Sequence, residues 1–161
     1  MSDTVQTADN QYLTFTLDGE QYAVEVAKVK EVLEFTELTK VPRTHDFMRG
    51  VINLRGSVVP VVDLRLKFDM GRTEQTIDTS IVVMEVGIDN ETVVIGTLAD
   101  SVQEVIGLND QQIEAAPKIG TAIDNKFIDG IGKLDDRFII ILDIDRIFKD
   151  EELASVTEHS A

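Results

Sequence analysis

The chain has 161 residues, the size of one domain or of two tightly packed half-size barrels. Hydrophobic residues make up 43% of it and charged residues 28%, so it can bury a core and lacks the composition of a disordered protein. Thirty acidic residues against fifteen basic ones give a formal charge of −15, which disfavours binding to nucleic acid and to anionic membranes.

The chain contains no cysteine and only two histidines, which excludes disulfides, thiol nucleophiles and the common zinc sites. Residues 1–10 lack the basic and apolar regions of a signal peptide. The longest apolar stretch, 138–142, is too short to span a bilayer. We therefore expect a cytoplasmic protein without direct membrane insertion.

Short strands are expected from the start. Apolar residues alternate over 13–17 and again over 22–26, on either side of the turn pair Asp18-Gly19, which predicts a β-hairpin. Residues 29–33 then change period, because two valines and a leucine are spaced i, i+3, i+4. This spacing predicts one or two helical turns with the three side chains on one face.

The middle of the chain predicts two further hairpins. The first has strands over 51–54 and 58–64, joined by a turn at 55–57. Pro60 donates no backbone hydrogen bond, so its strand should lie at a sheet edge or next to a bulge. The second hairpin pairs residues 80–86 with 92–98.

Towards the C-terminus, Asn109 and Gln112 form a capping-box pattern, which predicts a short helical turn. Residues 127–134 and 138–142 predict another hairpin, and apolar spacing over 144–148 predicts a terminal amphipathic helix. No repeat of fixed period is found. About nine or ten short strands with few helical turns predict an all-β fold of the barrel or sandwich class.

The sequence offers little chemistry. His45 and His159 lie far apart, and Gly130-x-Gly132 lacks the third glycine of a dinucleotide-binding loop. The clusters Asp135-Asp136 and Asp143-x-Asp145 lack the ligand spacing of a calcium loop. We expect no enzyme activity, no metal and no cofactor. The alternative is an enzyme that uses a pair of carboxylates for acid–base catalysis in a motif that we do not recognise.

Arg55 is the exception among the polar residues, because it lies between two apolar runs. An arginine at the mouth of a hairpin core needs a carboxylate or carbonyl partner. Two interpretations are open: a structural ion pair, or a residue that shapes a protein-binding groove.

Several segments resemble the CheW-like chemotaxis coupling proteins, and the resemblance covers about residues 12–152. Its main carrier is Gly50-Val51-Ile52-Asn53-Leu54-Arg55-Gly56 followed by Val58-Val59-Pro60-Val61-Val62-Asp63-Leu64-Arg65. Agreement in order and spacing extends to Phe15-Thr16-Leu17 through Tyr22-Ala23-Val24, Val29-x-Glu31-Val32, Gly96 through Asp100-Ser101-Val102-x-Glu104-Val105, Gly130-Ile131-Gly132-Lys133-Leu134 and Ile140-Ile141-Leu142-Asp143-Ile144.

The resemblance implies two five-stranded SH3-like barrels packed around a shared core, with short helical turns and a C-terminal helix. The implied CheW-like domain covers residues 12–152 and consists of two intertwined β-barrel subdomains. It lies between a flexible N-terminal tail, 1–11, and a frayed C-terminal tail, 153–161.

The function implied by the resemblance is that of a coupling protein between methyl-accepting chemoreceptors and the histidine kinase CheA. Such a protein scaffolds its partners without a reaction or a cofactor. It is cytoplasmic, recruited to membrane receptor arrays, and monomeric on its own. The alternative is a homologous adaptor in another receptor-linked signalling array, such as one that governs surface motility.

Two surfaces follow from the resemblance. The implied receptor-binding groove between the barrels comprises Val29, Glu31, Val32, Arg55, Val102 and Val105. Within it, we expect Glu31 and Arg55 to pair and brace the groove. The implied kinase-binding residues are Gly56, Ser57, Val58 and Val59 in one hairpin, and Glu114 and Ile119 on the other side. The last two depart from the basic and aromatic residues that relatives can have there, so this second interface is expected to be weak or compensated in the partner.

Overall fold

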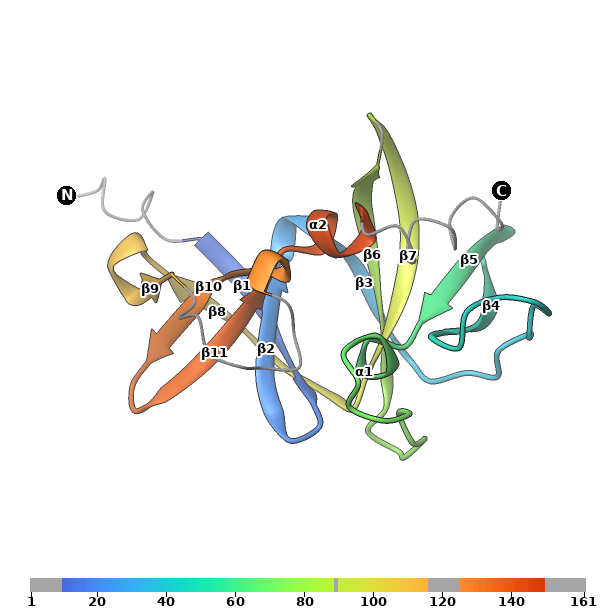
Figure 1. The fold of residues 1–161 in the computed structure, drawn as a ribbon, viewed down its shortest axis with the longest axis horizontal. Coiled ribbons are helices and arrows are strands. Elements are labelled where there is room, and N and C mark those ends of the chain that lie inside the picture. Colours follow the sequence, from blue (N-terminus) through green and yellow to red (C-terminus); the bar gives the residue numbers. More distant parts are fainter. Residues whose placement is uncertain (1–9, 89, 116–124, 150–161) are drawn as a thin grey trace.

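The computed structural model describes residues 10–88, 90–115 and 125–149. Within these ranges eleven strands form two sheets, which lie next to each other in Figure 1 with the short helix α2 (Ile144–Lys149) between them. The expected all-β fold of two barrels is therefore confirmed.

The first barrel has the strand order β8-β1-β2-β11-β10-β9. Strand β9 is only two residues long and adds a sixth strand to the five expected. The bounds are β1 (Asn10–Leu17), β2 (Glu20–Glu25), β8 (Ser101–Leu108), β9 (Ile113–Glu114), β10 (Ile128–Leu134) and β11 (Arg137–Leu142). Two 3₁₀ turns, η3 (Asp110–Gln112) and η4 (Asn125–Phe127), precede β9 and β10, and η3 has the capping box expected at Asn109.

The second barrel has the strand order β3-β6-β7-β5-β4. Its strands are β3 (Val29–Glu34), β4 (Met48–Leu54), β5 (Ser57–Val62), β6 (Ser80–Ile88) and β7 (Glu91–Ala99), and the helix α1 (Leu64–Lys67) follows β5. The hairpin turns at Asp18-Gly19 and Arg55-Gly56 both have two consecutive positive φ angles. This geometry matches the right-handed twist of the strands that each turn joins.

The barrels exchange strands. β2 belongs to the first barrel, but the next strand, β3, pairs with β6 of the second. In the same way β7 belongs to the second barrel and β8 pairs with β1 of the first. Two short linkers therefore cross between the barrels: the 3₁₀ turn η2 (Val26–Lys28), and Asp100.

One buried cluster joins the two barrels. It takes side chains from β1 and β2 on one side, from β5 and β6 on the other, and from α2. Burying each large apolar side chain contributes about 1.5–3 kcal/mol, so this shared core holds the barrels together. Its most deeply buried members include Phe15, Leu17, Val62, Met84, Ile147 and Phe148.

The two barrels contain a structural repeat. Strands β4 and β5 have the same register as β10 and β11, which lie 80 positions later. Gly50 pairs with Val61 in the first hairpin, and Gly130 pairs with Ile141 in the second. In both hairpins the register shifts next to the glycine. The expectation that no repeat of fixed period exists is therefore wrong.

The repeat continues into the segments that follow. The backbone N–H of Asp63 donates to Phe47 O at 2.7 Å, and that of Asp143 donates to Phe127 O at 2.9 Å. A helix begins after each aspartate, α1 after Asp63 and α2 after Asp143. Few residues are identical between the two copies, and alternating apolar residues occur in every strand here, so the pattern alone did not reveal the repeat.

The expected helical turn at 29–33 is wrong. These residues form β3, whose side chains alternate between half-buried and exposed, and the one turn of 3₁₀ helix lies just before them at Val26–Lys28. Three apolar residues at i, i+3, i+4 suit a short helix, but pairing with β6 and the β preference of valine outweigh that spacing. Val29 and Val32 therefore lie on opposite faces of a strand.

Two smaller expectations are also modified. Pro60 lies inside the sheet, since β5 has β4 on one side and β7 on the other. Its pairing with β7 begins only at Val61, and the register shift against β4 lies close by, so the expected bulge is present and the expected edge is not.

Asn10 and Gln11, assigned to the N-terminal tail, pair with β8. The rest of both tails lies outside the described residues.

Candidate protein-binding surfaces

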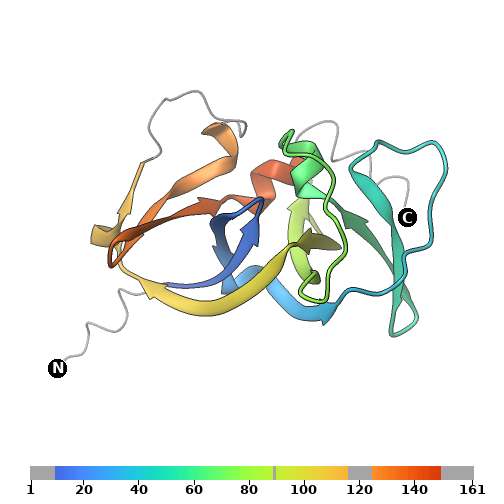
Figure 2. The same cartoon turned by 90° about the horizontal axis from the view of Figure 1, so that it is seen from below.

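The valines expected to bind the receptor lie on two edge strands. β3 ends the second sheet and β8 ends the first, and Figure 2 shows both along the same side of the molecule. Val29 and Val102 are half-buried and pack on the shared core. Val32 is 41% exposed and Val105 is 49% exposed.

The set therefore divides into two kinds of residue. Val29 and Val102 fix the two edge strands to the core, whereas Val32 and Val105 present apolar surface to solvent. Exposed apolar side chains on strands from both barrels can form the floor or rim of a docking surface for an apolar partner face.

Glu31 and Arg55 form the expected pair. Arg55 lies in the β4–β5 turn, and its two terminal nitrogens donate to the two carboxylate oxygens of Glu31, at 2.5 and 3.1 Å. These hydrogen bonds hold the pKa of the Glu31 carboxyl below its usual value. The Arg55 side chain is 72% exposed, so the pair contributes little to stability. Its effect is to join the β4–β5 turn to the edge strand β3.

The β4–β5 hairpin presents its tip to solvent. Gly56 N donates to Asn53 Oδ1 at 2.8 Å, which fixes the turn. Gly56 and Ser57 are exposed, and Val58 is 62% exposed. Val59 is buried in the core of the second barrel. Of the four residues of this hairpin that are expected to bind the kinase, three can touch a partner, and Val59 can only anchor the hairpin.

The buried carboxylate of Asp63 stabilises the end of this hairpin. Asp63 is fully buried and accepts hydrogen bonds from Arg49 Nη1, from the backbone and hydroxyl of Thr73, and from Arg65 N. It thus links β4, α1 and the loop before β6. Sequence reasoning used Asp63 only as part of the family motif. An aspartate that directly follows a strand and precedes a short helix is the signal that could have identified it as a cap.

The second kinase surface is only partly described. Glu114 lies on β9 and pairs with Lys133 on β10, and Ile119 lies outside the described residues. Phe138, on β11, is 66% exposed. It occupies the position equivalent to Val58 in the repeat, so each barrel presents one apolar side chain just after its hairpin turn. Sequence reasoning did not single out Phe138, because this residue lies in the continuous apolar stretch 138–142, which has no alternation to mark an outward face.

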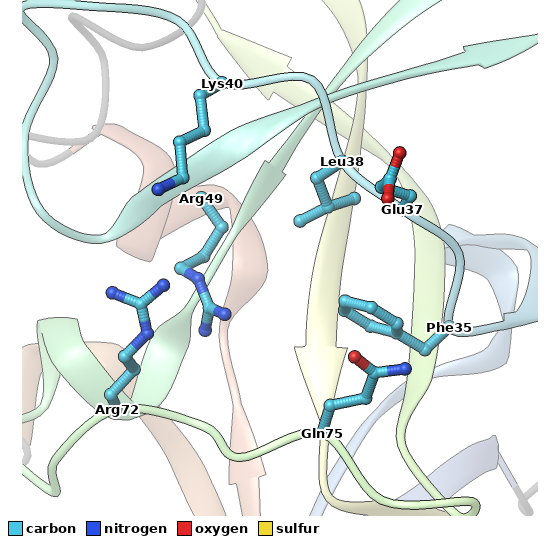
Figure 3. Close-up of a pocket in the computed structure, with 7 residues that line it drawn as sticks. All are labelled: Phe35, Glu37, Leu38, Lys40, Arg49, Arg72 and Gln75. Atoms are coloured by element: carbon cyan, nitrogen blue, oxygen red, sulfur yellow. The ribbon is translucent and has the colours of Figure 1, made fainter.

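A pocket of about 310 Å³ opens beside the segment that follows β3 (Figure 3). It is lined by Phe35, Glu37, Leu38, Lys40, Arg49, Arg72 and Gln75. Arg49 is already neutralised by Asp63 at 2.8 Å, and Lys40 and Arg72 are exposed. The pocket therefore offers exposed surface cations and an apolar wall, without a preorganised anion site.

Neither metal-ligand clusters nor membrane-spanning helices occur in the described part of the chain. The ring of His45 stacks on Phe47 with centroids 5.0 Å apart. The glycines of Gly130-x-Gly132 lie inside β10, where a Cβ atom would come within 2.7 Å of Ile113 or of Leu108. Gly130 is therefore needed for the close approach of β9, because its Cβ would also lie 3.1 Å from Glu114 O, whereas the end of the Leu108 side chain can move away from Gly132.

Comparison with known proteins identifies the family of the chain. The model of the CheW-like domain family matches residues 11–152. The chain is 34% identical to the chemotaxis protein CheW of Klebsiella aerogenes over 151 residues, which are 94% of this chain and 89% of that protein. It is 29% identical to the chemotaxis protein CheW of Bacillus subtilis over the full length of both.

A solved structure is similar as well. The scaffolding protein TtCheW of Thermoanaerobacter tengcongensis superposes with a TM-score of 0.78 at 34% sequence identity. The match covers 89% of this chain and 90% of that one. The architecture of two barrels that exchange strands is therefore shared with a scaffolding protein.

Proposed function

The chain belongs to the CheW-like family of chemotaxis coupling adaptors, and on this premise we propose that it links the cytoplasmic tip of methyl-accepting chemoreceptors to the regulatory domain of the histidine kinase CheA. It acts by binding two partners at once and requires no reaction. It is cytoplasmic, monomeric on its own, and recruited to membrane receptor arrays through the receptor. Its formal charge of −15 keeps free copies apart.

One observation carries this proposal: exposed apolar residues occur on two separate surfaces that one ion pair connects. Val32 and Val105 lie on the edge strands, and Val58 lies at the tip of the β4–β5 hairpin. The Glu31–Arg55 pair joins the hairpin to β3. A partner that moves the edge strand can therefore act on the hairpin through this contact.

We assign the edge-strand surface to the receptor. The receptor tip is taken as a helical segment, and an amphipathic helix binds through an apolar stripe set between charged residues. Glu31 on β3 and Glu104 on β8 are next to the exposed valines in the sequence, and each forms an ion pair, with Arg55 and Arg137 respectively. A receptor helix with an apolar stripe between polar residues would match the exposed valines and the ion pairs beside them.

We assign the β4–β5 hairpin to the kinase. The tip is rigid, because Asn53 fixes the turn, Val59 anchors the second strand and Asp63 supports its end. A rigid tip loses little conformational entropy on binding. The Glu114 side is a weaker second contact, since its carboxylate is already engaged by Lys133.

Two matched variants test the assignment. Val32→Asp and Val58→Asp each place a charge at an exposed valine, on different surfaces, so neither should prevent folding. In pull-downs with receptor tip and kinase regulatory domain, we expect Val32→Asp to lose the receptor and keep the kinase, and Val58→Asp to do the reverse. Wild-type binding of both partners by both folded variants would refute the proposal.

A further inference from the structure

Each linker that crosses between the barrels is held by a salt bridge to one of the two short helices. The linkers are η2, which contains Lys28, and Asp100. The helices are α2, which carries Asp145, and α1, which carries Arg65. None of these four residues belongs to the receptor or kinase surfaces proposed above.

At the first crossing, Lys28 Nζ lies 2.8 Å from Asp145 Oδ2. The other oxygen of Asp145 accepts from Gly87 N on β6 at 3.0 Å. Burial alone would raise the pKa of Asp145, but the hydrogen bonds from Lys28 and Gly87 outweigh it and hold that pKa below the usual value. Asp145 thus connects α2, which follows a strand of the first barrel, to the linker and to a strand of the second.

At the second crossing, Arg65 Nη1 lies 3.0 and 3.2 Å from the two carboxylate oxygens of Asp100. Asp100 also accepts from Asp18 N at 2.8 Å, and Arg65 Nη2 lies 3.5 Å from Asp18 Oδ1. Asp18 belongs to the β1–β2 turn of the first barrel. Arg65 follows a strand of the second barrel, so this contact also passes between the barrels.

The two contacts are related by the repeat. Asp145 lies 80 positions after Arg65, the same offset that relates the two hairpins. The helix residue is basic at one crossing and acidic at the other, and the linker charge is reversed to match. Each helix therefore attracts its own linker and would repel the equivalent linker of the other crossing, which adds specificity to the strand exchange.

These residues are partly sheltered from water. Arg65 is 17% exposed, and among the described side chains its Nε is the one buried nitrogen without a hydrogen-bond partner. The charge of Arg65 is balanced by the carboxylates of Asp100 and Asp18, and its Nη2 also donates to Met70 O at 3.1 Å. Because Arg65 Nη1 is shared between both oxygens of Asp100 and the contact is half-buried, it is screened less by solvent than an exposed pair.

The crossings lie directly before the receptor surface. Lys28 precedes Val29, the first residue of β3, and Asp100 precedes β8, which carries Val102. Fixing both linkers fixes where the two edge strands leave the core. We propose that the Lys28–Asp145 and Arg65–Asp100 salt bridges are positioning contacts that set the relative orientation of β3 and β8, and so set the affinity for the receptor helix without touching it. This inference rests on the proposed receptor surface.

Neutral variants test it. Lys28→Met and Arg65→Met each remove one salt bridge and keep an apolar stem. We expect each to weaken binding of the receptor tip by about fivefold or more, the lower end of typical coupling between sites. Binding of the kinase regulatory domain should stay within about twofold, since the β4–β5 hairpin is fixed within one barrel. Arg146→Met is the matched control, because it removes a pair on α2 with Asp143 that does not cross between barrels.

A purely structural role would weaken both partners together and lower the melting temperature, and that outcome would overturn the inference. Wild-type receptor affinity in both variants would overturn it too. A second measurement needs no partner: residual dipolar couplings report the orientation of β8 relative to β3 in the free protein. We expect them to change in Lys28→Met and not in Arg146→Met. If the orientation of the two strands does not change, the inference about the salt bridges is refuted, even if the proposed receptor surface is correct. If the wild-type protein does not bind the receptor tip, only the proposed receptor surface is refuted.

Discussion

Arg55 donates to both carboxylate oxygens of Glu31 across a gap of 24 residues in the chain, and so joins a hairpin tip to an edge strand. The sequence raised two interpretations of Arg55, a structural ion pair or a residue that shapes a groove. Its exposure favours the second, since an exposed pair adds little stability but can hold two surface elements in one arrangement.

The first prediction concerns this pair. Glu31→Arg and Arg55→Glu should each weaken receptor binding, because each places two like charges side by side, and the double variant should restore binding. Affinity for the receptor tip measures the effect. Lys30→Glu is the control, since Lys30 also lies on β3 and its contact with Glu85 on β6 is longer, at 3.9 Å, and exposed. If both single variants fold and the double variant fails to recover, the pair does not brace the surface.

The second prediction uses the repeat to compare two aspartates. Asp63→Ala should destabilise the protein by about 3–5 kcal/mol, because it leaves the charge of Arg49 buried without its partner. Asp143→Ala, at the equivalent position, should cost about 1 kcal/mol, since Asp143 is partly exposed and serves mainly to cap α2. Urea unfolding gives both values. Similar losses in the two variants would show that the Asp63 network has no special role.

The third prediction concerns pH. Burial raises the pKa of Tyr22 to about 12 and also raises that of Tyr12. A group with a raised folded-state pKa contributes stability that is complete below its unfolded pKa of about 10 and is lost as pH rises through the folded value. These are the only tyrosines in the chain and there is no tryptophan, so ultraviolet absorbance reports them cleanly. Tyrosine ionisation near pH 10 in the folded protein would contradict the burial of both rings.

The fourth prediction concerns one glycine. Gly50 has φ +149°, and a Cβ atom there would lie 2.6 Å from Thr39 O. The segment around Thr39 closes the barrel by pairing with Val51. Gly50→Ala should therefore lower the melting temperature and loosen the contact between the β3 and β4 regions. Gly19→Ala is the comparison, because it has a positive φ but no atom near its Cβ position, and so it isolates the cost of backbone strain. Equal losses in both would exclude the steric explanation.

Much of the fold follows from the sequence, because its signals are local. The hairpin at Asp18-Gly19, the capping box at Asn109 and the terminal helix are set by nearest neighbours and were predicted. The strand at 29–33 was assigned as a helix because its conformation depends on pairing with β6, some 50 residues away in the chain.

The binding surfaces could likewise be predicted only where they did not depend on contacts between distant parts of the chain. The resemblance supplied the position of Glu31 and Arg55, and the structure shows their contact. It could not show that Val59 is buried or that Phe138 is exposed, because burial depends on which face of a barrel strand looks inward. The salt bridges at the two crossings were equally hidden, since each joins residues from distant parts of the chain.

The most direct test of the adaptor function is an NMR titration of the isotope-labelled protein with the receptor tip and the CheA regulatory domain. We predict that the receptor shifts amide signals of β3 and β8, that the kinase domain shifts those of the β4–β5 hairpin, and that both sets of changes persist when the two partners are present together. Competition between the partners for one set of residues, or no change with either partner, would contradict the account.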